Sequence, residues 1–294
     1  MAIALVILLA LMFSYILSRR IAKPIKAIVE ATKNYSHGDY TGRVITRQKD
    51  EIGALAGNIN EMADFIEASE EVRKNFISDV SHELRTPMTT ISGFVGGILD
   101  GTITGDKERE YLSIVLDETK RLSRLTGQLL DISRLEGTAL SKHRFDINEA
   151  VRLCVINFEN LIREKNLNVK VDFDDEQCLV YADRDAIQRV LTNLIDNAIK
   201  FTDPFGEITV KTEDKSTDIR ISVHNTGIGI TKDELRNIWD RFYKADKSRS
   251  RNRYGTGLGL FIAKNIVNLH EKDITCESIP GEYAEFTFTL DKLR

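Results

Sequence analysis

Hydrophobic side chains fill almost every position from Ala2 to Leu17, and only Ser14 and Tyr15 interrupt them. Arginine and lysine residues follow immediately, at positions 19, 20, 23 and 26. A basic flank directly after an apolar run marks the cytoplasmic end of a membrane helix, whereas a secretory signal peptide carries its positive charge before the run. Residues 1–17 are therefore expected to form a transmembrane helix.

This apolar run is short for a complete membrane span. At 1.5 Å of rise per residue, about 17 residues cover roughly 25 Å, against about 30 Å of hydrocarbon in a bilayer. We therefore expect the chain to begin partway into the helix, so that an upstream sensing domain is missing from this sequence. The expected location is the inner (cytoplasmic) cell membrane, with everything after the span in the cytoplasm.

The apolar pattern changes twice within residues 18–70. An amphipathic stretch from Ile21 to Lys33 contains Pro24, and a polar connector follows from Asn34 to Lys49. Beyond it the apolar residues are spaced alternately by three and four positions, as in the seam of a coiled coil; they are Ile52, Leu55, Ile59, Met62 and Ile66. The pattern predicts two short helices joined by an extended connector, and a plain coiled-coil linker is the alternative.

Residues 71–137 have the pattern of a helical hairpin. One long helix is predicted over residues 69–100, where Asp100-Gly101 ends it, and a second over residues 106–136, where Gly137 ends it. The second helix has an apolar stripe that is too wide for a single partner helix to cover. A second copy of the hairpin is therefore expected against it, which gives a dimeric four-helix bundle.

Beyond position 138, helical and strand-like segments occur in mixed order. Helices are predicted over residues 148–164, 184–200 and 258–269. Strands, recognised by alternating apolar and polar residues, are predicted over residues 167–173, 207–212, 218–223 and 284–290. Residues 138–294 are thus expected to form an α/β sandwich in which helices cover one face of a sheet.

Composition narrows the classes of function. The 294 residues are 42% hydrophobic and 29% charged, as expected for a folded chain of more than one domain. The formal charge of −4 lacks the basic surplus of a nucleic-acid binder, so no nucleic-acid partner is expected. The three cysteines lie far apart without a C-x-x-C pair, which indicates neither a zinc site nor a disulfide framework.

The first group of residues with recognisable chemistry is Ser81-His82-Glu83-Leu84-Arg85-Thr86-Pro87, inside the first hairpin helix. A single histidine on a helix is usually a solvated or core side chain, but this one has an adjacent carboxylate and a downstream proline. Glu83 is expected to act as general base or orienter, fixing the tautomer of His82 so that one ring nitrogen is an unprotonated nucleophile. Pro87 lacks an N–H and is expected to bend the helix just after His82.

This segment resembles the phosphoacceptor motif of the sensor histidine kinases of two-component systems. The resemblance implies that residues 71–137 are a HisKA-type dimerisation and phosphotransfer domain, and that His82 passes a phosphoryl group to the receiver domain of a response regulator. Thr86, one helical turn from His82, is expected to position water for a phosphatase reaction. Residues 18–70, with Asp50-Glu51-Ile52-Gly53 opening the second helix, resemble a HAMP signal-relay module.

Asn193, Asn197 and Lys200 recur at helical spacing and so share one face of a predicted helix. Carboxamide oxygens are hard ligands suited to Mg²⁺, and a lysine neutralises phosphate charge. Without a ligand the same residues would be an exposed polar helix face. The run through Phe201 resembles the N box of the family, which implies that Asn193 and Asn197 hold Mg²⁺ and that all four residues bind ATP.

Asn225, Gly227 and Gly229 follow a predicted strand, and the glycines permit a tight turn and a close backbone approach to a flat ligand. The segment resembles the G1 box, but the family generally has aspartate where this chain has Asn225. The amide oxygen can still accept a hydrogen bond from the adenine amino group, although without negative charge. We expect weaker adenine selectivity or affinity and not loss of binding, because a neutral hydrogen bond contributes only about 1 kcal/mol net.

The run from Trp239 to Lys244 resembles the F box and includes Phe242. A polar run to Arg253 follows, and it is expected to close over ATP as a lid, with Lys244 and Arg249 reaching the phosphates. The lid ends at a segment that resembles the G2 box, where glycine-rich backbone leads into a helix whose N-terminal amides bind phosphate. This segment contains Gly255, Thr256, Gly257, Leu258 and Gly259.

These motifs predict that residues 138–294 are a HATPase_c catalytic domain of the Bergerat ATP-binding type, since no P-loop sequence G-x-x-x-x-G-K-[ST] occurs. The predicted function is ATP-dependent autophosphorylation of His82, with transfer to an aspartate of a response regulator and phosphatase activity. An ATP-driven conformational machine of the same fold would need a catalytic glutamate where this chain has Asp196. A degenerate kinase that acts as a dimeric signalling scaffold is the other alternative, suggested by Asn225.

Overall fold

The computed structural model describes residues 2–46, 48–135, 140–244 and 255–293. The chain divides into two compact units, Met1–His82 and Glu83–Arg294. The first unit opens with a continuous helix made of α1 (Ala2–Leu17), a short π-helical turn (Ser18–Ala22) and α2 (Lys23–Ser36). Within the described residues it is the one helix long and apolar enough to cross a membrane. The amphipathic stretch expected after the apolar run is thus fused to it.

The π-helical turn lies next to Pro24. Proline has no N–H, so the carbonyl of Arg20 lacks the α-helical hydrogen bond that residue 24 would otherwise donate. The side chain of Gln48 compensates, because its Nε2 donates to this carbonyl at 2.6 Å. The backbone N–H of Lys23 reaches back to the carbonyl of Ser18. A connector residue therefore holds the junction between the apolar helix and α2.

The helix α3 is a single element of 49 residues, Glu51–Leu99. The sequence pattern predicts one helix for the coiled-coil seam and a separate one over residues 69–100, and this separation is wrong. Glu67 and Ala68 are strong helix formers, and no glycine or proline stands between the two predicted segments. The helix also continues through Pro87, so the bend predicted there stays a prediction.

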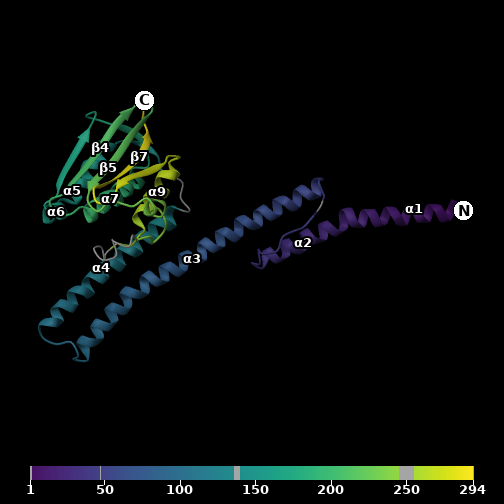
Figure 1. Ribbon diagram of the computed structural model, residues 1–294, viewed down its shortest axis with the longest axis horizontal. Helices are drawn as coiled ribbons and strands as arrows, with labels where there is room; N and C mark the ends of the chain where they lie inside the picture. Colours follow the sequence, from purple (N-terminus) through teal and green to yellow (C-terminus); the bar gives the residue numbers. More distant parts are fainter. Residues whose placement is uncertain (1, 47, 136–139, 245–254, 294) are drawn as a thin grey trace. The chain divides into compact units, whose positions relative to one another are not determined.

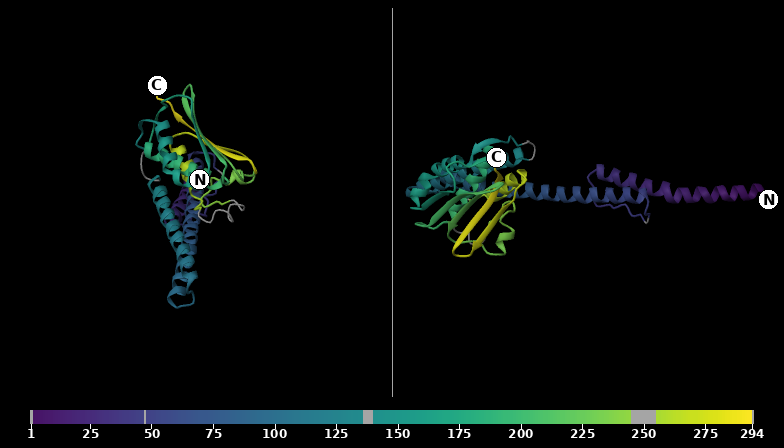
Figure 2. Two further views of the ribbon diagram at one scale, coloured as in Figure 1. Left: turned by 90° about the vertical axis from the view of Figure 1, so that its left-hand side faces the viewer. Right: turned by 90° about the horizontal axis from the view of Figure 1, so that it is seen from above.

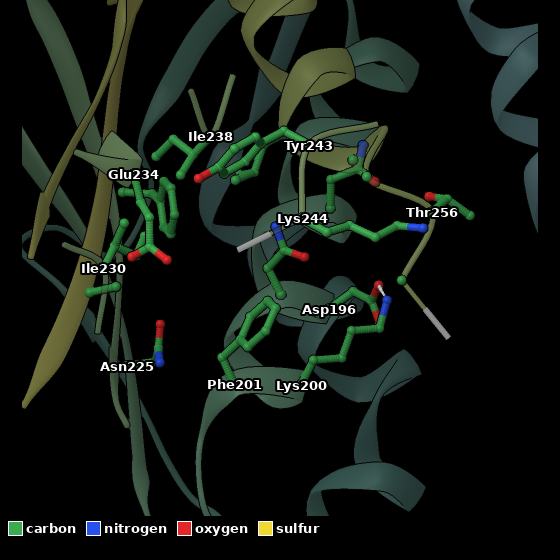
Figure 3. Close-up of a pocket in the computed structure, with 18 of the residues that line it drawn as sticks. Asp196, Lys200, Phe201, Asn225, Ile230, Glu234, Ile238, Tyr243, Lys244 and Thr256 are labelled. Carbon is green, nitrogen blue, oxygen red and sulfur yellow. Dashed lines mark hydrogen bonds and ion pairs between the residues drawn. The ribbon is translucent and has the colours of Figure 1, made fainter. Parts of the chain in front are cut away.

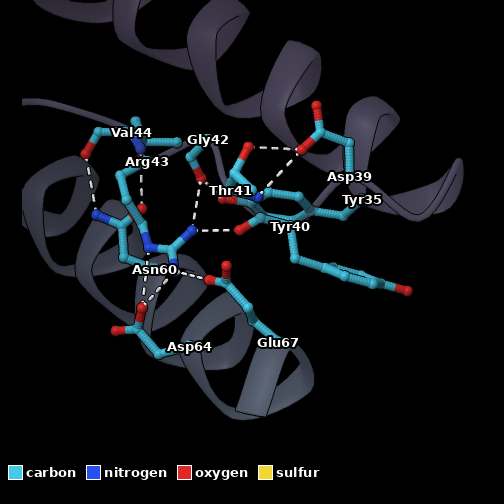
Figure 4. Close-up of polar contacts among 10 residues, drawn as sticks. All are labelled: Tyr35, Asp39, Tyr40, Thr41, Gly42, Arg43, Val44, Asn60, Asp64 and Glu67. Atoms are coloured by element: carbon cyan, nitrogen blue, oxygen red, sulfur yellow. Dashed lines mark hydrogen bonds and ion pairs between the residues drawn. The ribbon is translucent and has the colours of Figure 1, made fainter. Parts of the chain in front are cut away.

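Arg43 of the connector forms ion pairs with α3 (Figure 4). Its guanidinium contacts Asp64 at 2.6 Å and Glu67 at 2.7 Å. The backbone of Val44 exchanges two hydrogen bonds with the Asn60 amide, at 2.8 and 3.0 Å, in the manner of a strand pair. One residue each from α2, the connector and α3 makes the small core beneath these contacts: Ile28, Val44 and Ala56. The polar connector is therefore ordered by side chains from both helices.

In the second unit, the C-terminal part of α3 and α4 (Asp106–Leu135) form the predicted hairpin (Figure 1). The N–H of Ile103 closes its turn with a 2.7 Å hydrogen bond to the carbonyl of Gly97. The rings of Phe94 and Tyr111 lie 4.6 Å apart, one from each helix. Toward its C-terminal end α4 buries apolar side chains in the core of the following α/β domain, among them Leu125 and Ile132.

The α/β domain contains a five-stranded sheet in the order β2-β4-β5-β7-β6. β2 and β4 are parallel, and the other neighbouring pairs are antiparallel. The strands are β2 (Asn168–Phe173), β4 (Glu207–Lys215), β5 (Asp218–Thr226), β6 (Ile274–Ile279) and β7 (Tyr283–Asp291). A separate pair is formed by β1 (His143–Asp146) and β3 (Leu179–Ala182).

Helices cover one face of the sheet (Figure 2), which confirms the predicted α/β sandwich. They are α5 (Ile147–Asn157), α6 (Glu159–Glu164), α7 (Arg184–Phe201) and α9 (Gly259–Leu269). The single helix expected over residues 148–164 is wrong, because the chain turns at Phe158, whose N–H bonds the carbonyl of Val155 at 3.1 Å. β1, β3 and β6 were not predicted.

Candidate functional site

One pocket in the α/β domain brings most of the predicted binding residues together (Figure 3). It has a cavity volume of about 140 Å³ and lies between α7, the end of β5, the start of α9 and β7. The predicted residues that line it are Asn193, Asn197, Lys200, Phe201, Asn225, Gly229, Lys244, Gly255, Thr256, Gly257 and Gly259. All four predicted nucleotide motifs thus contribute to one cavity.

Three of the described residues that were predicted to bind are not part of this lining. Gly227 and Phe242 belong to the surrounding backbone, and Leu258 is fully buried in the hydrophobic core. Arg249 lies outside the described residues. The predicted lid lies there almost entirely, since positions 245–254 are not described.

The helix α7 supplies the polar floor of the pocket. Asp183 caps its start, with Oδ1 accepting a 3.0 Å hydrogen bond from the N–H of Ala186. Asn193, Asn197 and Lys200 then follow at intervals of four and three residues, so they share one helix face. Lys200 forms an ion pair with Asp196 in the pocket wall (Figure 3). Its cation is therefore held in place by a partner one helical turn away.

The other end of α7 is fixed by Lys165. Its Nζ donates to the carbonyls of Ile199 at 2.7 Å, Lys200 at 3.2 Å and Thr202 at 3.2 Å. A cation at a helix C-terminus satisfies the last carbonyls and complements the helix dipole. Burial lowers the pKa of Lys165 from its ordinary value. This lysine sets the position of the helix turn that carries Lys200 and Phe201.

Asn225 lies at the end of β5 and is only 3% exposed. Its Nδ2 donates to the carbonyl of Thr226 at 3.1 Å, which fixes the orientation of the amide. Figure 3 shows the amide oxygen directed toward the part of the pocket that Ile230 and Glu234 line. The amide oxygen therefore faces the pocket as a hydrogen-bond acceptor, and its contact with adenine stays a prediction.

Two glycines are required by close backbone contacts around the pocket. Gly257 has φ +75°, and a Cβ there would lie 2.6 Å from the backbone carbon of Phe242. The N–H of Phe242 donates to the carbonyl of Gly257 at 2.9 Å, so the two predicted motifs are directly bonded. Gly227 has φ +151°, and a Cβ there would lie 2.2 Å from the carbonyl oxygen of Phe201. Larger residues at these positions would displace the pocket walls.

Several lining residues were not predicted. They are Gln128, Asp196, Ile228, Ile230, Glu234, Ile238, Tyr243, Leu260, Ala284 and Phe286. The apolar members make walls suited to a flat ring. Glu234 opens the short 3₁₀ helix Glu234–Arg236, and its carboxylate accepts from the N–H and hydroxyl of Thr231, both at 2.8 Å. The sequence from Thr231 to Glu234 has the capping-box pattern, which could have identified Glu234 as a residue at the start of a helix.

The residues present suit a magnesium ion at the polar end of the pocket. Among the described residues no group of three or more His, Cys, Asp or Glu side chains could hold a metal by itself. In nucleotide sites, however, Mg²⁺ takes only one or two protein oxygens and completes its shell with phosphates and water. Asn193 and Asn197 offer two amide oxygens one helical turn apart in the same pocket wall.

The predicted phosphoacceptor residues lie on α3, where His82 and Thr86 are both exposed. Glu83 Oε2 accepts hydrogen bonds from Arg121 Nη2 of α4 at 2.8 Å and from Lys244 Nζ at 2.9 Å. Successive helix residues point in different directions, so Glu83 reaches α4 while adjoining His82 in the chain. Its role toward His82 stays a prediction.

Three families match consecutive parts of the chain. Residues 16–67 match the HAMP domain, and residues 72–138 match the His Kinase A (phospho-acceptor) domain. Residues 182–294 match the histidine kinase-, DNA gyrase B- and HSP90-like ATPases. The order of these matches is the order expected from the sequence motifs.

Curated relatives are similar over most of the chain. Sensor histidine kinase YclK of Bacillus subtilis is 34% identical over 294 residues, 97% of this chain and 62% of YclK. Sensor protein SrrB of Staphylococcus aureus is 38% identical over 226 residues, 76% of this chain and 39% of SrrB. The chain thus spans less than two thirds of the length of these relatives.

Solved structures show the same architecture. Histidine kinase ThkA, in a crystal structure with response regulator protein TrrA, is 28% identical with a TM-score of 0.65, covering 77% of this chain and 64% of ThkA. Histidine kinase AdeS of Acinetobacter baumannii is 26% identical with a TM-score of 0.59, covering 72% of this chain and 98% of AdeS. The chain belongs to the sensor histidine kinases of two-component systems, and residues 182–294 are the part that matches the ATPase family.

Proposed function

We propose that the chain binds ATP in the pocket of the α/β domain, transfers the γ-phosphoryl group to His82 and then passes it to an aspartate of a response regulator. The observation that carries this proposal is the convergence of four separate motifs on one cavity, in a chain whose α3 carries the phosphoacceptor motif. The ThkA structure holds a kinase of the same architecture together with a response regulator, which supports the second transfer.

The adenine base is proposed to lie between the apolar walls, near Asn225. The Asn225 oxygen faces the cavity because its amide nitrogen is bonded to Thr226, so it accepts a hydrogen bond from the adenine amino group. A guanine base would present a carbonyl oxygen to the same acceptor. The fixed amide therefore favours ATP over GTP.

The phosphates are proposed to lie toward Lys200, Lys244 and the N-terminus of α9. The backbone amide of Gly257 lies just before that helix, and the amide of Gly259 belongs to its first residue. The helix dipole favours anions at this end. Asn193 and Asn197 would hold Mg²⁺, which when bound neutralises phosphate charge. Lys200, oriented by Asp196, adds a positive charge at the same end of the pocket.

In the proposed transfer, the lone pair of an unprotonated ring nitrogen of His82 forms a bond to the γ-phosphorus. The bond from that phosphorus to the bridging oxygen breaks, and its electron pair leaves with ADP. The imidazole proton is retained on the other nitrogen or shared with a base, for which Glu83 is the neighbouring carboxylate. In the second transfer an aspartate oxygen of the regulator replaces the nitrogen. Thr86 is proposed to position water for phosphatase activity.

The chain is proposed to act as a homodimer anchored in the membrane. Leu112 and Leu116 of α4 are 51% and 54% exposed, and Met88 of α3 is 57% exposed, so the hairpin offers apolar side chains to a second hairpin. The apolar helix beginning at Ala2 supports anchoring, with the HAMP region directly after it.

Incubation of the full chain in detergent with γ-labelled ATP and Mg²⁺, beside a His82→Gln variant, tests the proposal. We expect label that is acid-labile, as phosphohistidine is, and absent from the variant. A folded dimer that binds ATP without labelling would instead favour the signalling scaffold. Label that persists in His82→Gln would place the phosphoacceptor elsewhere.

A further inference from the structure

Two polar side chains of the pocket are held by residues of the hairpin. Lys244 and Thr256 line the pocket and stand on either side of residues 245–254. Lys244 Nζ donates to Glu83 at 2.9 Å, and Thr256 Oγ1 donates to Gln128 Oε1 at 2.5 Å. Both partners belong to helices of the hairpin. Polar groups available to the nucleotide phosphates are thus already engaged by the domain that carries the phosphoacceptor motif.

The Lys244 contact is part of a compact charged cluster. Glu83 also accepts from Arg121 at 2.8 Å, and Arg121 lies 3.5 Å from Glu118. The side chains of Glu83, Arg121 and Lys244 are 20%, 13% and 22% exposed, so water screens these charges only partly. Two carboxylates and two cations balance one another. Removal of Lys244 from the cluster leaves Glu83 with a single cation shared with Glu118.

A phosphate group bound at Lys244 would compete with Glu83 for the same ammonium. If the Glu83 carboxylate and a phosphate both bound Lys244 Nζ, a multiply charged phosphate would lie close to a partly buried carboxylate. Like charges at that separation repel. Phosphate carries more charge than a carboxylate and so is the stronger partner for a lysine. Lys244 can therefore exchange its Glu83 partner for a nucleotide phosphate.

We propose that nucleotide binding is coupled to the hairpin through this exchange: the phosphates of ATP take Lys244 from Glu83, and Glu83 becomes available beside the phosphoacceptor histidine. Glu83 is then a positioning residue whose availability depends on the nucleotide, and Lys244 is the side chain that reports nucleotide binding to the hairpin. The inference rests on the proposed function, since it assigns a regulatory step to the same pocket. Until ATP binds, Arg121 and Lys244 both hold the Glu83 carboxylate through hydrogen bonds, at 2.8 and 2.9 Å.

The proposed exchange predicts the direction in which the affinity for nucleotide changes. If Glu83 competes with phosphate for Lys244, then Glu83→Gln removes the competitor and tightens nucleotide binding. The gain should be roughly three- to tenfold in Kd, the range expected for one partly exposed charged hydrogen bond. A purely structural role for Glu83 would leave Kd unchanged or weaken binding.

A double-mutant cycle tests the exchange. The Kd of the non-hydrolysable analogue AMPPNP with Mg²⁺ is measured by calorimetry on the full chain in detergent, for the wild type, Glu83→Gln, Lys244→Gln and the double variant. We expect Glu83→Gln to tighten binding in the wild-type background and to have no effect in the Lys244→Gln background. Glu118→Gln is the matched control, because Glu118 contacts Arg121 and should change Kd by less than about twofold.

Thermal unfolding of each variant shows whether it is folded. Unchanged or weaker binding by Glu83→Gln would overturn the exchange, as would equal tightening in both backgrounds. These outcomes would leave the proposed function intact, because the wild type would still bind nucleotide. A wild-type chain that binds no AMPPNP would overturn the proposed function and the exchange with it.

Discussion

Replacing Asn225 by aspartate adds a negative charge where the adenine base is proposed to bind and leaves the size of the side chain almost unchanged. The Asn225 Nδ2 donates to the Thr226 carbonyl, and because both residues belong to β5 we expect this bond in the free and in the nucleotide-bound protein. Loss of this bond therefore lowers the stability of the domain, by about 1–2 kcal/mol, and cancels from the binding free energy. A carboxylate accepts a hydrogen bond from the adenine amino group roughly twice as strongly as an amide, whose bond contributes about 1 kcal/mol. The net gain of about 1 kcal/mol corresponds to a roughly fivefold lower Kd for ATP.

Calorimetric titration with ATP and Mg²⁺ measures this effect, with thermal unfolding followed in parallel. We expect Asn225→Asp to bind ATP about five times more tightly while unfolding at a lower temperature. Asn225→Ala is the matched control and should bind about five times more weakly, since it loses the neutral hydrogen bond. If Asn225→Ala binds normally and Asn225→Asp binds no more tightly than the wild type, Asn225 does not contact the base and the reasoning fails.

Three further predictions concern other parts of the chain. Gly257→Ala should weaken ATP binding at least about tenfold, because its Cβ would meet the Phe242 backbone at 2.6 Å, whereas Gly101→Ala, at φ +77° with open space around it, should not change Kd. Burial lowers the pKa of His270, so the neutral form is favoured in the folded domain; thermal stability should be fully present above about pH 6.5 and fall as the pH drops below it, less steeply in His270→Gln. Thr86→Ala should impair dephosphorylation of the regulator more than autophosphorylation, and equal loss of both would contradict its assignment.

Much of the fold followed from local patterns in the sequence. The helices α4 and α7 have strong helical periodicity and clear ends, and α7 begins after the capping residue Asp183. The four predicted strands alternate apolar and polar residues over several positions, as half-buried strands must. Motif spacing likewise placed Asn193, Asn197 and Lys200 on one helix face. Such features depend on residues that are neighbours in the chain.

Features that depend on distant partners were not predictable in this way. β1 and β3 are four residues long and are strands because they pair with each other, as Phe145 does with Val180. Gln128 belongs to α4 and lines the pocket only because that helix packs against the α/β domain. The pairing of Glu83 with Lys244 joins residues 161 positions apart. No local periodicity contains this information.

The glycine-rich motifs have a structural role besides any contact with nucleotide, because they let separate motifs approach one another. Gly227 lies against the carbonyl of Phe201 at the end of α7. A Cβ on Gly259 would lie 3.2 Å from the Asn193 side-chain oxygen, so the start of α9 sits directly on the polar face of α7. A side chain added at either position would move α7 relative to its neighbours. The position of the Asn193 and Asn197 amides therefore depends on glycines from two other motifs, and the pocket is assembled as one unit.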